Sequence, residues 1–539
     1  MTPDDPAHAG ARRQVVGAAR VVGGLTLLSR VFGLLRDAVC ARVFGAGPVW
    51  SAFAFAFLLP NLARRLFGEG AITGAFIPAY ARLSESDPEG ARRYASAMLA
   101  LVVAAVFALA IVVEGVLLGL YFFTPLGESG GLALLLAMVL LPFAPMVCVT
   151  ALLGGVLQSH HRFAPTAAAP VILNLCIIAA VLVAAAVGAS LESAAFAAAG
   201  GVLVAGALQI AWSLAAARAH TSWTAHFAPA AREVRETLRR TAPVILGLGA
   251  LQLNTLLDGL IASYPVLVGP TLFVPGVGAV EYPLDEASNA ALFFAHRLYQ
   301  FPLGVFGIAL ATAVFPMLAR QAKDPPAFAA TLRDGLRLTL FIGLPASVGL
   351  VLVRTDLVAV ILAGGLFDAD AVRRVATILA GYAPAVWAYA MNHTLTRAYY
   401  ARGDTTTPMR VSIAFVALNV PLNFALIWPL AEAGLAWSTA ICAVGQFLTL
   451  AALWRRRHAP APALLHPDTA RSAAWTVGLS VVMAGAVLLT LALLPAEGEG
   501  RATDLLRLGA AVAVGAGAFL GGAAIAGRPE VRWLVRRGP

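Results

Sequence analysis

Charged residues are scarce in this chain of 539 residues, where they make up 12% of the positions and only 28 are acidic. Hydrophobic residues make up 60%, and the mean hydropathy is +0.82. So little charge over so long a chain excludes an ordinary soluble protein. At about 20 apolar residues for each membrane-spanning helix, the chain can hold a dozen or more spans and no sizeable soluble domain. We therefore expect a polytopic membrane protein.

Cysteine is equally rare, and the four residues are Cys40, Cys148, Cys176 and Cys442. They lie singly in apolar stretches without a CxxC spacing, which excludes a disulfide framework and a zinc site. The chain has no HExxH motif, no Walker loop and no dense acidic loop. A membrane glycosyltransferase or lipid phosphatase would need a paired acid or a histidine nucleophile, and the adjacent His160 and His161 are poor candidates. We expect no enzyme and no cofactor.

Long apolar runs predict an all-α protein of about fourteen membrane-spanning helices. The runs lie near 22–44, 50–67, 94–122, 132–157, 166–188, 192–217, 242–267, 290–313, 336–353, 377–400, 409–428, 434–454, 474–494 and 504–526. Arginines gather in alternate loops, as the positive-inside rule requires of cytoplasmic loops. This pattern accounts for the net charge of +10 without a nucleic-acid partner and places both termini in the cytoplasm. The apolar segment 358–367 contains two glycines and leaves a re-entrant loop open as an alternative to a span.

A weak internal repeat suggests how the helices are grouped. The pattern Ala71-x3-Ala75-x2-Pro78-x2-Ala81-Arg82 recurs from Ala309 to Arg320, although chance remains an alternative in so alanine-rich a chain. Two parallel six-helix repeats would give such a match. We expect a disordered cytoplasmic N-terminus at 1–20, lobes at 21–220 and 221–457, a helix pair at 458–528 and a cytoplasmic tail at 529–539. Residues 268–289 form an enlarged outer loop in this scheme.

The first two predicted helices carry charges that a bilayer should reject. Arg30, Arg36 and Asp37 lie inside the run 22–44, beside Ser29, and each mid-membrane arginine costs about 2.5–3.5 kcal/mol on insertion scales. The second helix ends in Asn61, Arg64, Arg65 and Glu69, and the eighth contains His296 and Arg297. Local acids are too few to neutralise these arginines, which favours a cavity that binds an anion, since guanidinium suits phosphate. Snorkelling to headgroups or structural ion pairing is the alternative, above all for Arg42 and Arg65.

Several of these stretches resemble one known family. The runs SRVFGLLRDAVCARVFGAG, LLPNLARRLFGEGAITGAFIPAYARL, FFAHRLYQFPLGVFGIALATAVFPMLAR and YYARGDTTTPMRV resemble the lipid II flippases, the MurJ/MviN family of the multidrug, oligosaccharidyl-lipid and polysaccharide exporter superfamily. The resemblance implies alternating access in the bacterial cytoplasmic (inner) membrane, with the lipid tail in a groove beside helices 13 and 14. It implies that a cationic cavity holds the diphosphate of lipid II, the undecaprenyl-diphosphate-linked peptidoglycan precursor.

The resemblance also assigns roles to single residues. The implied substrate-binding residues are Ser29, Arg30, Arg36, Asn61, Arg64 and Arg297. The implied gate residues or structural ion pairs are Asp37, Arg65, Glu69 and His296. This chain departs from the family at Ser51 and His296, where an acid is usual, and at Leu58, where a lysine is common. We expect a monomer that contacts membrane lipids and cell-wall synthesis proteins. An exporter of another lipid-linked oligosaccharide or polysaccharide and a non-transporting scaffold remain alternatives.

A second set of polar residues raises the question of a coupling ion. It consists of Asp258, Asn419, Asn423 and Thr439. Some family members bind sodium at similar positions, where one has a carboxylate in place of Asn423. Oxygen ligands suit a hard cation, so a sodium site is one hypothesis, and hydrogen bonds between helices are the other. The sequence leaves the energy source open between membrane potential, sodium, protons and mass action.

Overall fold

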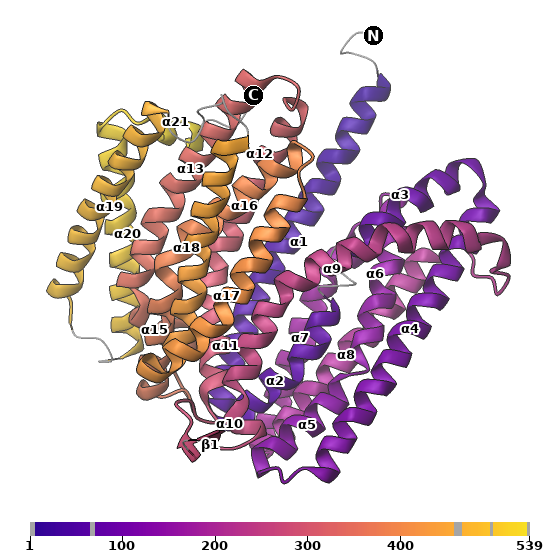
Figure 1. Cartoon of the computed structure of the whole chain (residues 1–539), viewed down its shortest axis with the longest axis horizontal. Helices are drawn as coiled ribbons and strands as arrows, with labels where there is room; N and C mark the ends of the chain where they lie inside the picture. Colours follow the sequence, from indigo (N-terminus) through magenta and orange to yellow (C-terminus); the bar gives the residue numbers. More distant parts are fainter. Residues whose placement is uncertain (1–5, 65–70, 277, 458–465, 496–499, 536–539) are drawn as a thin grey trace. The chain divides into compact units, whose positions relative to one another are not determined.

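The structure is a computed structural model that describes residues 6–64, 71–276, 278–457, 466–495 and 500–535. The chain divides into two compact units, unit 1 ending at Ala290 and unit 2 beginning at Ala291. Within the described ranges both units are built of helices, and one short hairpin is the exception (Figure 1). The predicted all-α polytopic class is therefore confirmed.

The described helices also bear on the number of spans. Nine of them are long and apolar enough to cross a membrane, and the bent pair Ser288–Pro302 and Phe306–Arg320 would add a tenth. Each of the fourteen predicted runs overlaps one helix or a series of consecutive helices. The count of fourteen crossings stays a prediction, because several of these helices are short, broken or polar.

Unit 1 contains the elements up to the outer loop. Their bounds are α1 Pro6–Phe44, α2 Pro48–Ala63, α3 Ala71–Ser86, α4 Pro88–Phe123, α5 Glu128–Leu140, α6 Phe143–Ser159, α7 Ala164–Ala186, α8 Leu191–Ala217, η2 Ala228–Ala230, α9 Ala231–Ala262, α10 Tyr264–Leu267, β1 Thr271–Val274 and β2 Gly278–Glu281. Helix α1 packs on α7, α2 packs on α5, and α8 packs on α6 and α7. The helix α1 begins within the segment predicted to be disordered, since alanine and arginine there favour a helix.

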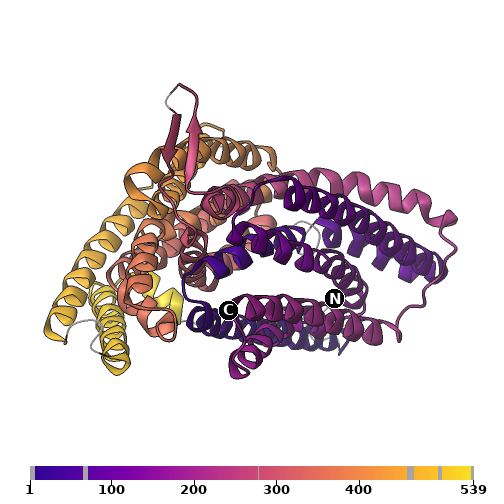
Figure 2. The ribbon, with the colours of Figure 1, turned by 90° about the horizontal axis from the view of Figure 1, so that it is seen from below.

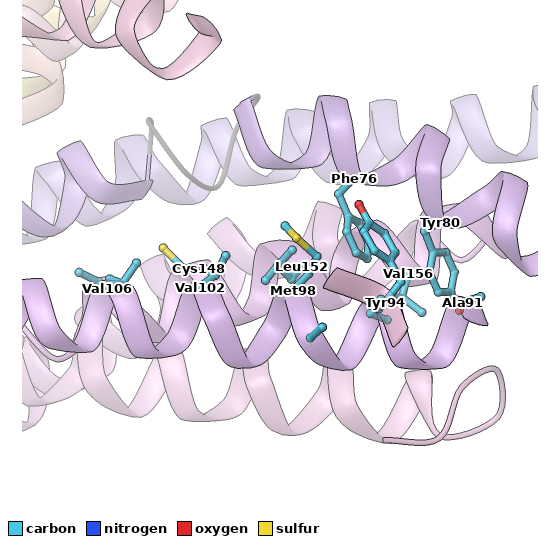
Figure 3. Packing of buried hydrophobic residues seen from close by; sticks show 14 residues of the cluster. Phe76, Tyr80, Ala91, Tyr94, Met98, Val102, Val106, Cys148, Leu152 and Val156 are labelled. Carbon is cyan, nitrogen blue, oxygen red and sulfur yellow. The ribbon is translucent and has the colours of Figure 1, made fainter. Parts of the chain in front are cut away.

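An aromatic cluster fixes α3, a helix that lies between the predicted second and third spans. Phe76 of α3 stacks on Tyr80 of the same helix and on Tyr94 of α4, with ring centroids 5.6 and 5.3 Å apart (Figure 3). All three side chains are almost fully buried, and Cys148 and Leu152 of α6 complete the cluster. The Tyr94 hydroxyl and the Thr237 hydroxyl of α9 are hydrogen-bonded at 2.7 Å. The cluster therefore joins α3, α4, α6 and α9.

The loop predicted to be enlarged, 268–289, contains the hairpin. Strands β1 and β2 pair antiparallel, with Thr271 opposite Glu281, and project as a two-stranded arm (Figure 2). At its base the rings of Tyr264 and Tyr282 lie 4.5 Å apart. The Tyr264 hydroxyl donates to the Thr271 carbonyl, and the Tyr282 hydroxyl donates to the Ile261 carbonyl. These bonds attach the hairpin to α9 and α10.

Unit 2 contains the remaining helices. Their bounds are α11 Ser288–Pro302, whose first residues belong to unit 1, η3 Leu303–Ile308, α12 Ala309–Arg320, α13 Pro325–Leu352, α14 Arg354–Leu362, α15 Ala369–Tyr382, η4 Ala383–Ala385, α16 Val386–Ala401, α17 Thr406–Leu430, α18 Glu432–Arg457, α19 Pro467–Leu493, α20 Arg501–Ile525 and α21 Pro529–Val535. Helix α16 packs against η3, α12, α13 and α18. The nine residues of α14 extend about 13.5 Å at 1.5 Å per residue, less than a hydrocarbon core of about 30 Å. This helix covers the first half, 358–362, of the segment 358–367, for which a re-entrant loop was an alternative.

Both copies of the sequence pattern form helices. The first forms α3, which begins at Ala71, and the second forms α12, which begins at Ala309. The six residues before α12 form a π-helical segment, and the helix pair bends by 43° there. If Ala71 is aligned with Ala309, Arg297 lies opposite Leu59, five residues before Arg64. In this alignment Arg64 and Arg297 do not occupy corresponding positions.

Two buried ion pairs fix the last helices to the rest of unit 2. Arg507 of α20 donates to Asp356 of α14 at 2.8 Å and to carbonyls at the end of α19. Glu530 of α21 accepts from Arg337 of α13 at 2.7 Å and from Ser472 of α19 at 2.6 Å. The predicted role of this helix pair in holding a lipid tail stays a prediction.

Candidate functional site

In unit 1 the charged stretch that begins at Ser29 contains a closed polar network. The Arg36 guanidinium donates to the Asp37 carboxylate at 2.5 and 3.0 Å and to the Asn174 side-chain oxygen of α7 at 3.0 Å. The Asn174 amide donates in turn to the Ser29 carbonyl at 3.3 Å. Arg36 is 7% exposed and Asp37 4% exposed. This arrangement neutralises one arginine inside the helix bundle and ties α1 to α7.

Arg30 lies in a different environment on the same helix. Its side chain is half-buried, and no acidic group lies within 4 Å of it in the described part of the chain. The exposed apolar positions nearby are Leu27, Leu28, Val31 and Leu35, as expected of a surface that meets lipid. Of the arginines predicted in α1 to bind substrate, Arg30 is therefore the one whose guanidinium is available to an anion.

The end of α2 places a second arginine beside an amide. Arg64 donates through two nitrogens to the Asn61 side-chain oxygen, at 3.0 and 3.3 Å, and both residues are half-buried. Proline at position 60 lies inside the helix one turn before Arg64. Arg65 and Glu69, which the resemblance also implicates, lie outside the described residues. The predicted substrate-binding roles of Asn61 and Arg64 stay predictions.

The departures at Ser51 and Leu58 have structural explanations. The buried Ser51 hydroxyl accepts a hydrogen bond from the Ala290 backbone amide at 2.9 Å, in the first turn of α11. Serine thus provides an oxygen at a helix N-terminus, where an acid would also be favourable. Leu58 packs against the bare backbone of Gly259 in α9, since a methyl group added there would lie 2.7 Å from it. Neither departure places a charge in the helix bundle.

In unit 2 the eighth predicted helix presents Arg297 and His296 on α11. The Arg297 guanidinium lies 5.1 Å from the centre of the Phe293 ring. His296 stacks on Tyr299 at 5.1 Å, and Tyr299 stacks on Tyr382 of α15 and Tyr389 of α16. Both His296 and Arg297 are half-buried. An aromatic layer therefore supports the backbone that carries the arginine.

Two ionisable residues of α16 were missed in the sequence analysis. His393 and Arg397 lie one turn apart on this helix, inside the predicted span 377–400. His393 is exposed and Arg397 is half-buried. The sequence did contain a signal for them, namely ionisable residues inside an apolar run, which is also the feature that identified Arg30 as a candidate. Arg397 is close in sequence to the basic loop that contains Arg402 and Arg410. From the sequence alone it is therefore easily assigned to that loop.

The residues of the predicted ion site in α17 and α18 bond to one another. Asn423 donates to Asn419 at 2.9 Å, and Asn419 donates to Ser438 at 3.3 Å and Thr439 at 3.4 Å. Asn419, Asn423 and Ser438 are almost fully buried. Asp258, the fourth predicted ligand, belongs to unit 1 and accepts from Asn254 at 3.3 Å. The contacts in unit 2 favour the hypothesis of hydrogen bonds between helices, and the sodium site stays a prediction.

Solved structures with a similar fold define the class. A multidrug-resistance MATE transporter of the MOP superfamily, in its inward-facing conformation, has a TM-score of 0.63 at 15% identity, with 83% of this chain and 100% of that chain covered. A lipid II flippase MurJ in its inward closed conformation has a TM-score of 0.77 at 22% identity, with 96% and 99% covered. The fold is therefore that of MOP-superfamily transporters, which are polytopic membrane proteins.

Sequence comparison narrows the class to one family. The family model of the lipid II flippase MurJ matches residues 40–500. The probable lipid II flippase MurJ of Rhizobium tropici is 33% identical over 481 residues, which cover 87% of this chain and 85% of that protein. The probable lipid II flippase MurJ of Vibrio cholerae is 29% identical over 501 residues, or 89% and 90%. The chain belongs to the lipid II flippase MurJ family, as the sequence motifs predicted.

Proposed function

We propose that this chain moves lipid II from the inner to the outer leaflet of the bacterial cytoplasmic membrane. The observation that carries the proposal is its family membership along most of its length, with relatives described as lipid II flippases. Both termini lie in the cytoplasm in this proposal, and the substrate enters from that side. The protein then works by alternating access, opening first inward and then outward.

The proposed substrate contacts are arginines that each unit exposes at least in part. Unit 1 supplies Arg30 and Arg64, and unit 2 supplies Arg297; all three are half-buried. A guanidinium can bind a diphosphate through two parallel hydrogen bonds, which makes arginine better suited than lysine. Arg36 has a supporting role, because its guanidinium is bonded to Asp37 and Asn174 in this structure.

The proposal is tested by the accessibility of the lipid II headgroup at the outer face of cells depleted of this protein. Wild-type protein should restore the outward appearance of the headgroup, whereas Arg30→Ala and Arg297→Ala should reduce it at least tenfold. Arg218→Ala is the matched control, because Arg218 ends α8 at an exposed position. Headgroup export that continues unchanged during depletion would refute the proposal. Restoration by both arginine variants would favour a scaffold.

A further inference from the structure

The strongest feature outside the residues implied by the family is a polar stripe along α16. Its buried side faces α12, α13 and α18. The stripe is the opposite side, at positions four or three residues apart, where no side chain is fully buried. It consists of Tyr389, His393, Thr396, Arg397 and Tyr400.

The composition of the stripe shows which solvent it meets. On the neighbouring helix α17 the large hydrophobic side chains that are exposed include Met409, Ile413, Leu418, Phe424 and Trp428, a set suited to lipid. The stripe on α16 instead has a histidine, an arginine and two tyrosines. A lipid-facing arginine would be costly, and ionisable residues inside membrane spans usually face a water-filled cavity. His393, Arg397 and Tyr400 are therefore better suited to water than to lipid.

Arg397 is held in place without losing its charge. Its guanidinium lies 5.3 Å from the centre of the Phe315 ring of α12. No acidic side chain lies within 4 Å of it among the described residues. A cation–π contact orients an arginine and leaves its N–H groups available. The Arg402 guanidinium differs, because it lies 4.5 Å from the Phe328 ring and donates to the Ala322 carbonyl.

The stripe begins beside α11, the helix that carries Arg297. Tyr389, its first member, stacks on Tyr299 of α11 with ring centroids 5.5 Å apart. From Tyr389 to Tyr400 the stripe extends about 16 Å at 1.5 Å per residue. A headgroup that carries several anionic groups can span that length. The first member of the stripe therefore contacts α11, the helix that carries Arg297.

We propose that Arg397, with His393 one turn before it, is a second anion site for the headgroup of the transported lipid. The site takes a phosphate or carboxylate oxygen, while Arg297 of the same unit binds another anionic group. This inference rests on the proposed function, since it assigns further contacts to the same cargo. Arg397 binds the anion directly, and Phe315 positions the guanidinium.

The test is binding of two probes to the purified full-length protein in lipid nanodiscs. Undecaprenyl diphosphate carries the diphosphate alone, and lipid II carries the diphosphate with its sugar-peptide. Arg397→Gln should weaken binding of lipid II about tenfold or more, the order expected when a charge-assisted hydrogen bond is lost. Equal weakening for both probes would identify the diphosphate as the ligand. Weakening for lipid II alone would identify a carboxylate of the peptide.

Controls separate this site from snorkelling and from misfolding. Arg410→Gln removes a charge from an exposed position near the start of α17, which follows the end of α16 that carries Arg397. The protein with this substitution should bind both probes like wild type. Arg397→Lys keeps a charge that can snorkel, and it should recover only part of the affinity, because it lacks the guanidinium fork. The thiol introduced by His393→Cys should react with a water-soluble maleimide, and lipid II should protect it.

The outcomes also separate this inference from the proposed function. If Arg397→Gln binds both probes like wild type while Arg297→Ala does not, the second site is refuted and the function stands. If the wild-type protein binds neither probe and its depletion leaves headgroup export unchanged, the proposed function itself fails. A His393→Cys variant whose introduced thiol does not react with maleimide would place the stripe against lipid and would also refute the site.

Discussion

Single arginines in this chain have different surroundings, although the sequence presents them alike. Arg36 pairs with the residue next to it and with Asn174, 138 positions away. Arg30, six residues earlier, has no acidic group within 4 Å among the described residues. The hydrophobic pattern could show that both arginines lie in a membrane helix. It could not show which one pairs, because Asn174 reaches Arg36 only through the packing of α7 on α1.

A double substitution can separate the structural role of Arg36 from a role in substrate binding. Removal of one partner from a buried ion pair costs about 3–5 kcal/mol, whereas replacement of both by apolar residues is often neutral. Asp37→Leu alone should therefore lower the unfolding temperature strongly, and Arg36→Met with Asp37→Leu should restore most of it. Thermal unfolding in detergent measures the stability, and headgroup export measures the function. A stable double variant that still exports would show that Arg36 is only structural.

The hydrogen bond from Ala290 to Ser51 gives a second prediction at this scale. Ser51→Ala removes the side-chain acceptor at the start of α11 and should cost about 1 kcal/mol, the usual loss for a helix cap. Ser86→Ala is the control, since its exposed hydroxyl bonds only within its own helix. In thermal unfolding, Ser51→Ala should therefore have a lower unfolding temperature than Ser86→Ala. Equal unfolding temperatures would mean that Ser51 has no such role.

At the scale of elements, the long membrane-spanning helices could be predicted from the sequence, whereas the short elements between and after them could not. A run of twenty apolar residues predicts a helix regardless of its neighbours. By contrast, α3 depends on the stacking of Phe76 and Tyr94, and α21 depends on Glu530. The hairpin in the loop 268–289 has only four residue pairs, so the sequence predicted an enlarged loop there and no strands. Tertiary contacts decide whether such elements form.

The contact between α21 and α13 should depend on pH. Burial raises the pKa of Glu530, but hydrogen bonds from Ser472 and the backbone and the charge of Arg337 outweigh burial, so its pKa lies below the ordinary value. A lowered pKa means that the carboxylate stabilises the folded state above the ordinary pKa, and that this stabilisation is lost as the pH falls through the lowered value. The protection of the amides of 529–535 against hydrogen exchange, corrected for the intrinsic exchange rate at each pH, should therefore fall as the pH drops through this lowered value.

The matched variant for this prediction is Glu530→Gln, which removes the ionisable group and keeps the shape. It should give low protection at 529–535 at neutral pH and no further loss of protection in acid. Glu89→Gln alters an exposed ion pair and should leave exchange at the C-terminus unchanged. Slow exchange in Glu530→Gln would contradict a role for the carboxylate.

The π-helical segment η3 gives a prediction about close packing. A methyl group added at Gly307 would lie 3.0 Å from the side chains of Ala390 and Leu303, so Gly307→Ala should cost about 1–3 kcal/mol. Gly115 of α4 has no atom within 4 Å of such a methyl group, and Gly115→Ala should be neutral or stabilise by up to about 1 kcal/mol. Thermal unfolding measures both. Equal changes in the two variants would show that η3 can move away from α16 without cost.

For the whole molecule, the charges of the cargo and of the protein predict an effect of membrane potential. Each elementary charge that crosses the membrane contributes about 2.3 kcal/mol per 100 mV. When the inside is negative, the outward movement of an anionic headgroup lowers the electrical free energy by this amount for each charge. In the proposed cycle, collapse of the potential should slow export of the headgroup in proteoliposomes. An export rate independent of potential would mean that charge movement is not rate-limiting.

The burial of the cysteines has a practical consequence for the whole molecule. Cys40, Cys148 and Cys442 are buried, and Cys176 is half-buried. Reagents dissolved in water should label the native thiols weakly, so a single introduced cysteine can be read without first replacing the native ones. A series of such cysteines along α16, alternately on the stripe and behind it, would trace where water enters the protein during a transport cycle.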